Sequence, residues 1–140
     1  MHQTLRCIRT LIGTGLLALV IAAVWLVAEP ALIVDYHYGP HVVAFTHLVL
    51  LGFIVSVVMG VLYQLTPVVL QTRLYSERLA RWQFWFQVIG VAGMVWMFLR
   101  WDMREVGRCG SVFGVGVLLF IYNLARTLAR VTRWNVVAVG

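Results

Sequence analysis

One stretch limits what this chain can fold into more than any other: residues 40–67, which read PHVVAFTHLVLLGFIVSVVMGVLYQLTP. It contains no aspartate, glutamate, lysine or arginine. A run of about 20 apolar residues is long enough to cross a bilayer as a helix, which satisfies all of its own backbone hydrogen bonds. We therefore predict a membrane helix at 41–65, which at 1.5 Å per residue is about 36 Å long.

Three further apolar runs predict three further membrane helices, at about 11–28, 82–99 and 110–125. Hydrophobic residues make up 62% of the chain and charged residues only 11%. Water-soluble domains carry roughly 25% charged residues, so the composition excludes that class. We predict an all-α fold, an integral membrane four-helix bundle that forms a single transmembrane domain over residues 1–140.

The positive charge is carried by arginine alone, in clusters between the apolar runs. A net charge of +6 is also typical of nucleic-acid-binding proteins, but arginines that flank membrane segments indicate topology and no nucleic-acid partner. With both termini cytoplasmic, eight arginines are inside and three outside, as the positive-inside rule requires. The inner set is Arg6, Arg9, Arg73, Arg78, Arg81, Arg126, Arg130 and Arg133, and the outer set is Arg100, Arg104 and Arg108.

Two histidines at the start of the long run are the candidate functional residues. An imidazole inside a membrane segment is costly, so His47 is either a metal ligand, a proton relay or a buried hydrogen-bond partner. His41 follows Pro40 at the helix start, where it could simply meet water or lipid headgroups. Arg100 and Arg104 are either a solvated loop, paired with nearby acids, or a site for carboxylates, which arginine holds in a bidentate fork.

Other residue types give weaker signals. Gly52, Ser56 and Gly60 recur every four residues, and Gly110 and Gly114 form a GxxxG pattern, which favours close helix packing. Cys7 and Cys109 fall at opposite membrane faces and form no zinc motif. We find no nucleophile–base pair, paired membrane carboxylates or phosphate loop, so no complete catalytic constellation is present.

The second apolar run resembles a known family. HVVAFTH, followed by a glycine-bearing helix, Y-x-L-T-P and LYSERLARWQFWFQVIG, is similar to the second helix, loop and third-helix start of the haem-copper oxidase subunit I superfamily. That superfamily includes cytochrome oxidases and nitric oxide reductases, and the resemblance covers residues 36–95. It implies that His47 ligates the iron of a low-spin haem, with His41 as second choice. It also implies that Arg100 and Arg104 hold the haem propionates.

The chain also departs from that family. A subunit I has many more helices, its second haem ligand lies on a late helix, and histidines for a copper site are missing here. We therefore expect a truncated four-helix relative, a b-type cytochrome that binds haem b for electron transfer or for redox or gas sensing.

We expect this cytochrome in a bacterial or archaeal inner membrane, as a homodimer whose second copy supplies another His47 and His41, with Met94 or Met97 as weaker ligands. Quinone and cytochrome c are the candidate redox partners. The alternative is a cofactor-free scaffold or accessory subunit of a larger membrane complex.

Overall fold

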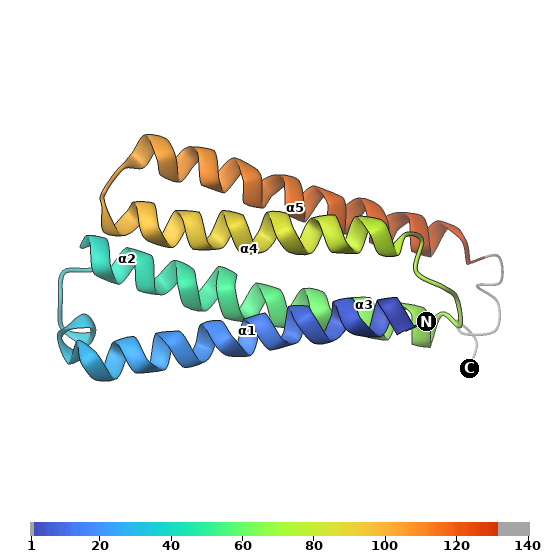
Figure 1. Cartoon of the computed structure of the whole chain (residues 1–140), viewed down its shortest axis with the longest axis horizontal. Helices are drawn as coiled ribbons and strands as arrows, with labels where there is room; N and C mark the ends of the chain where they lie inside the picture. The colour runs from blue at the N-terminus through green and yellow to red at the C-terminus, as the bar shows by residue number, and fades with distance from the viewer. Residues whose placement is uncertain (1, 132–140) are drawn as a thin grey trace.

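The computed structural model describes residues 2–131 and is helical throughout its regular elements (Figure 1). Four helical segments are long and apolar enough to cross a membrane, and no strand occurs among the described residues. This confirms the predicted all-α fold of an integral membrane four-helix bundle. The elements are α1 (His2–Ala28), η1 (Pro30–Ile33), α2 (Pro40–His47), η2 (Leu48–Val55), α3 (Ser56–Val69), α4 (Glu77–Leu99) and α5 (Met103–Ala129).

The second span is a single rod made of three segments. The α-helix α2 passes into η2, a stretch of wider π-helix, and then into α3, so that Pro40–Val69 forms one membrane-length helix. Pro40 sits in the first turn of α2, where its missing N–H leaves no hydrogen bond unmade. Pro67 lies near the end of α3, where the loss of a helical bond costs little.

The helices extend further than the apolar runs that predicted them. α1 begins at His2 rather than near residue 11, because arginine is a good helix former whose long side chain can reach the membrane surface. α4 and α5 begin earlier because polar side chains cap them. The Ser76 hydroxyl accepts from the Leu79 N–H, and the Asp102 carboxylate accepts from the Glu105 N–H.

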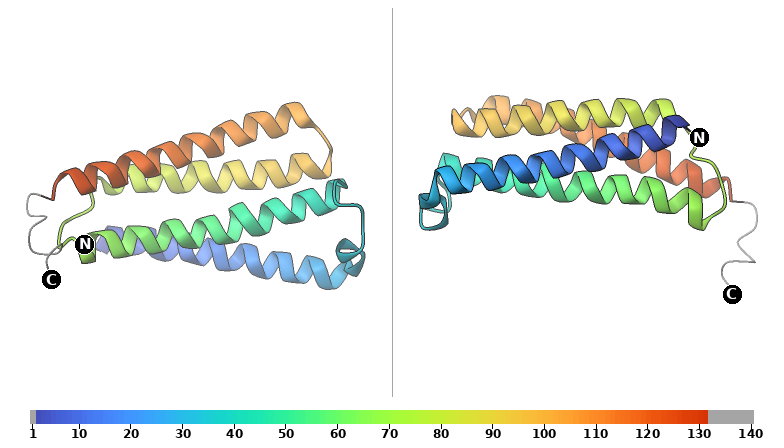
Figure 2. Two further views of the ribbon diagram at one scale, coloured as in Figure 1. Left: turned by 180° about the vertical axis from the view of Figure 1, so that it is seen from behind. Right: turned by 60° about the horizontal axis from the view of Figure 1, so that its bottom comes forward.

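The bundle has two distinct ends (Figures 1 and 2). At the loop end lie the connections 29–39 and 100–102, and at the terminal end lie the start of α1, the connection 70–76 and the end of α5. The outer set of arginines lies at the loop end, and the inner set lies at the terminal end, except for Arg133, which is outside the described residues. Which end faces the cytoplasm stays a prediction.

Glycines set how closely the helices approach. A β-carbon on Gly90 would lie 2.7 Å from the backbone nitrogen of Phe113, and one on Gly60 would lie 2.8 Å from the side chain of Ile12. Gly90 therefore joins α4 to α5, and Gly60 joins α3 to α1. A β-carbon on Gly114 of the predicted GxxxG pattern would meet nothing within 4 Å, so Gly114 makes no close contact with another described helix.

Candidate functional site

His47 ends α2 and is held in one orientation by its own helix. Its Nδ1 lies 2.8 Å from the carbonyl oxygen of Val43, one turn earlier. A carbonyl can only accept a hydrogen bond, so Nδ1 carries a proton, and in the neutral imidazole Nε2 then carries the lone pair. Metal-bound histidines are oriented in this way, with the other ring nitrogen donating to a backbone carbonyl or carboxylate. His47 therefore has the tautomer of a metal ligand.

The surroundings of His47 are apolar. Its half-buried ring lies 4.4 Å from the ring of Phe98 on α4, centroid to centroid. Phe98 belongs to a buried cluster with Ala44 and Met94. The π-helical segment η2 starts directly after His47, and such segments are frequent at functional sites. The imidazole thus stands in a water-poor layer between α2 and α4.

His41 has a different set of partners. Its Nδ1 lies 3.3 Å from a carboxylate oxygen of Glu29, and its ring meets Trp25 edge-on at 6.3 Å. Its side chain is 53% exposed. The structure thus places His41 against the 29–39 connection at the loop end, and His37 lies within that connection. The two candidate ligands on α2 are engaged separately.

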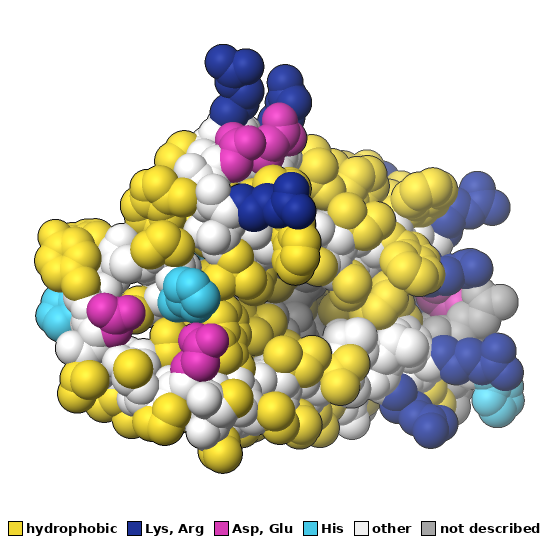
Figure 3. Space-filling model, turned by 60° about the vertical axis from the view of Figure 1, so that its left-hand side comes forward, with side chains coloured by type: hydrophobic (Ala, Val, Ile, Leu, Met, Phe, Trp, Pro, Cys, Tyr) yellow, Lys and Arg dark blue, Asp and Glu magenta, His cyan; other side chains and the backbone are white. Residues whose placement is uncertain are grey.

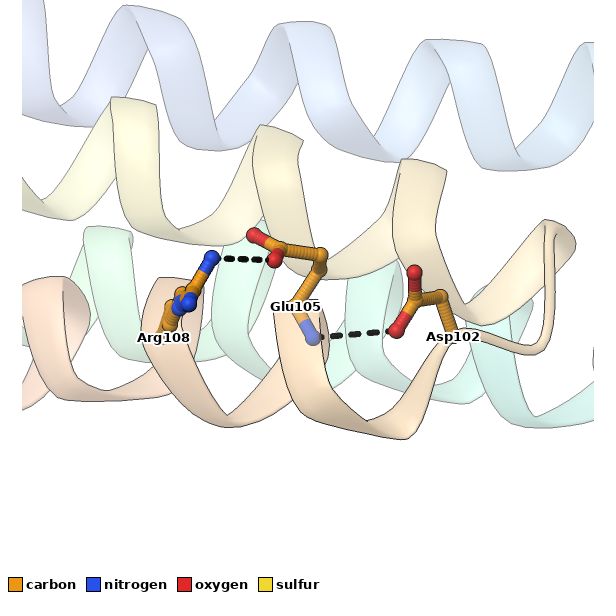
Figure 4. A network of polar contacts seen from close by, with 3 residues as sticks. All are labelled: Asp102, Glu105 and Arg108. Atoms are coloured by element: carbon orange, nitrogen blue, oxygen red, sulfur yellow. Dashed lines mark hydrogen bonds and ion pairs between the residues drawn. The ribbon is translucent and has the colours of Figure 1, made fainter.

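The outer arginines surround the turn between α4 and α5. The Arg100 guanidinium lies over the ring of Trp96 at 5.1 Å, and Arg108 pairs with Glu105 (Figure 4). Arg104 lies exposed in the first turn of α5. Figure 3 shows this end of the molecule, with arginine and acidic side chains together over the α4–α5 side, and histidine and acidic side chains over the α1–α2 side. Cations are therefore available at the end of the bundle where α2 starts.

A second polar region went unpredicted from the sequence. Gln87 of α4 donates from Nε2 to the Ser56 hydroxyl on α3 at 2.6 Å, and accepts from Gln83 Nε2 at 2.6 Å. Gln83 Nε2 also lies 3.2 Å from the sulfur of Met59. All of these side chains are buried. The i,i+4 spacing of two glutamines in an aromatic-rich helix was the signal that could have found this network.

Not every buried polar atom in that region has a partner. Within the described part of the chain, Tyr63 Oη and Gln83 Oε1 are buried without a hydrogen bond. Buried polar atoms of this kind are commonly satisfied by internal water. The network thus links α3 and α4 through neutral groups and offers no ligand for iron comparable with a histidine nitrogen.

The described residues offer a candidate for one axial ligand of a haem. They contain no cluster of three or more His, Cys, Asp and Glu side chains able to hold a bare metal ion. Haem needs no such cluster, because its porphyrin supplies four nitrogens and the protein only the axial ligands. His47 can supply one. Met94 is poorly placed to supply the other, because its sulfur faces α5, 3.5 Å from the β-carbon position of Gly110.

Comparison with known proteins identifies the family. The family model of cytochrome c and quinol oxidase polypeptide I matches residues 5–102, which run from α1 through α4 and make up more than half of the chain. No curated protein and no solved structure gives a significant match. The match includes the whole stretch, 36–95, that resembles haem-copper oxidase subunit I, and confirms that relationship. The chain belongs to the cytochrome c and quinol oxidase polypeptide I family.

Proposed function

We propose that this protein is a membrane b-type cytochrome in which His47 Nε2 is an axial ligand of haem iron. The observation that carries the proposal is the 2.8 Å hydrogen bond from Nδ1 to the Val43 carbonyl, which orients the ring and places the lone pair of the neutral imidazole on Nε2. When bound, haem supplies reversible one-electron chemistry at its iron, which suits electron transfer and redox or gas sensing.

The chain's own residues have three roles in this proposal. Val43 fixes the tautomer of His47, as described. The apolar side chains of Ala44, Met94 and Phe98 keep water away from the neighbouring layer, which affects the reduction potential of a bound haem. The third role belongs to the outer arginines.

Arg100 and Arg104 would pair with the haem propionates. His47 lies seven residues after Pro40, or about 10 Å along the helix from the loop end. Arg100 and Arg104 lie at that end, so their guanidinium groups would be available to hold the propionates of a haem bound at His47. A bidentate pair with a carboxylate would draw Arg100 away from the ring of Trp96.

The second axial ligand would come from a second copy of the chain. His41 of the same chain is engaged by Glu29, and Met94 faces α5. A homodimer with twofold symmetry would bring another His47 and His41 to the shared interface. We place this dimer in a bacterial or archaeal inner membrane, with a quinone or a cytochrome c as electron donor or acceptor.

The test is the visible absorption spectrum of detergent-purified protein, oxidised and then reduced with dithionite. Wild type should show a sharp reduced α-band of b type. His47→Ala should lose most of the haem, whereas His41→Ala should retain more of it, since His41 is only the second candidate. Full haem occupancy in His47→Ala would refute the ligand assignment. A colourless wild type, after expression with ample haem, would favour the accessory-subunit alternative.

A further inference from the structure

A groove at the terminal end of the bundle lies on the opposite side of the membrane from the proposed haem propionates. It runs between α1 and α4 and has a volume of about 290 Å³. Arg6, Cys7 and Thr10 of α1 line one wall, and Arg81, Phe84 and Trp85 of α4 line the other. The groove therefore has a cationic rim and an apolar floor, and neither feature takes part in the proposed haem site.

The charge around this groove is strongly one-sided. Arg6 and Arg81 reach it from the two helices, and both are exposed. Arg9 and Arg78 lie one turn or less away along the same helices. Of the chain's five acidic residues, only Glu77 lies at the terminal end, where its carboxylate accepts a hydrogen bond from the Thr4 hydroxyl. An anion in the groove would thus meet a clear excess of positive charge.

Exposed apolar side chains follow the groove along α1 and α4, toward the middle of the bundle. Trp85 is 56% exposed on the wall of the groove. One and two turns deeper along the helices, Ile89 of α4 and Leu17 of α1 are 59% and 57% exposed. Tryptophan is favoured at the level of lipid headgroups, and exposed aliphatic side chains below it suit acyl chains. The order of these surfaces, a cationic rim and then apolar side chains, is therefore complementary to a phospholipid, whose charged headgroup is followed by acyl chains.

We propose that this groove binds the phosphate headgroup of an anionic phospholipid, with Arg6 and Arg81 on the phosphate and Phe84 and Trp85 along the glycerol and upper acyl chains. Basic pockets between transmembrane helices on the cytoplasmic side are a recurring form of lipid recognition. A free phosphate ion would use the two arginines but would gain nothing from the aromatic wall. The assignment is therefore to a lipid and not to a soluble anion.

The test measures lipid binding to the full chain in a neutral detergent, where the attraction of a charged bilayer is absent. Phosphatidylglycerol is titrated and the thermal unfolding midpoint is followed, with phosphatidylcholine and inorganic phosphate as separate titrations. We expect a saturable rise in the midpoint with phosphatidylglycerol only. Arg6→Gln/Arg81→Gln should weaken that binding by roughly thirtyfold, since each basic residue near a lipid headgroup contributes on the order of 1 kcal/mol.

A matched variant controls for loss of charge. Arg9→Gln/Arg78→Gln removes two exposed arginines from the same two helices at the same end, but neither residue lines the groove. We expect its affinity to fall by no more than about threefold, and Arg6→Lys/Arg81→Lys to retain most of the wild-type affinity. Equal losses in the two glutamine variants would overturn the proposal. So would an equal response to phosphatidylcholine or to inorganic phosphate.

Discussion

The two halves of the bundle use their polar side chains in different ways. In the half that runs from Ser56 to the terminal end, buried polar groups join one helix to another or to a connection. Gln87 binds Ser56 across α3 and α4, and both polar atoms of the Asn123 amide bind the backbone of Ser76. In the half toward the loop end, His47 makes its hydrogen bond to a carbonyl of its own helix and none to another described element.

This difference separates structural groups from chemical ones. The Gln87 and Asn123 amides each use both the oxygen and the nitrogen in hydrogen bonds, so neither has a polar atom left for a ligand. The His47 ring is oriented by Val43, but that bond uses one ring nitrogen and leaves Nε2 for a ligand. An ionisable group inside a membrane is a functional-site hypothesis, and the contrast with Gln87 and Asn123 is the reason to propose His47 as the ligand.

The largest effect should come from His47→Leu. We expect most of the haem to be lost, while the stability of the haem-free protein changes by less than about 1 kcal/mol, the net worth of one hydrogen bond. Haem content is measured from the reduced spectrum, and stability from unfolding of haem-free samples in mixed micelles. If the variant lost much stability but retained haem, His47 would be a structural residue, and the two halves would not differ in how they use polar side chains.

The opposite pattern is expected for Gln87→Leu. The substitution removes two buried hydrogen bonds and leaves the Ser56 hydroxyl without its donor, which should cost about 1–2 kcal/mol in the free energy of unfolding. Haem content should stay at the wild-type level in samples kept folded. Gln64→Leu is the matched control, because Gln64 is an exposed glutamine on the same membrane span as Ser56. A similar loss in both variants would argue against the network.

A more local effect is expected for Asn123→Ala. The Asn123 carbonyl oxygen accepts from the Ser76 N–H at 3.0 Å, and its amide donates to the Ser76 carbonyl at 2.9 Å. Loss of both bonds should open the 70–76 connection with a cost of about 1–2 kcal/mol. Hydrogen exchange should accelerate in that connection and at the start of α4, and stay unchanged at the 100–102 turn. Equal acceleration at both places would indicate global destabilisation.

Most of the fold could be predicted from the sequence, because a membrane restricts the possible structures to few. Charge-free runs gave the four spans and the arginine clusters gave the division into two ends. The first residues of the helices were less predictable. Ser76 and Asp102 act as caps through hydrogen bonds to the backbone of Leu79 and Glu105. In the sequence they cannot be told from serine and aspartate residues in ordinary loops.

The site could be predicted only in part. His47 stood out because a histidine in an apolar run is rare, and the family relationship followed from the same stretch. The pairing of His41 with Glu29 was beyond reach, since it depends on how the 29–39 connection folds back. The Ser56–Gln87–Gln83 network was missed because neutral amides produce no charge pattern. The i,i+4 spacing of Gln83 and Gln87 could indicate a polar pair on one helix, but the link to Ser56 depends on how α3 and α4 pack.

The smallest effect concerns Tyr75, which lies outside the membrane spans in the terminal half. A hydrogen bond with Tyr122, and then the hydrogen bond and charge of Arg126, hold the pKa of Tyr75 below its usual value near 10. Between the folded and unfolded pKa values the unfolded chain binds more protons, so stability from this group rises with pH and is lost as pH falls through the folded pKa. Arg126→Gln should raise that pKa. The pKa is measured by following tyrosinate absorbance in the ultraviolet as a function of pH, and subtracting the titration of a matching protein that carries Tyr75→Phe. Arg104→Gln at the loop end should leave it unchanged, and equal shifts in the two variants would mean that net charge alone, and not contact with Arg126, sets the titration.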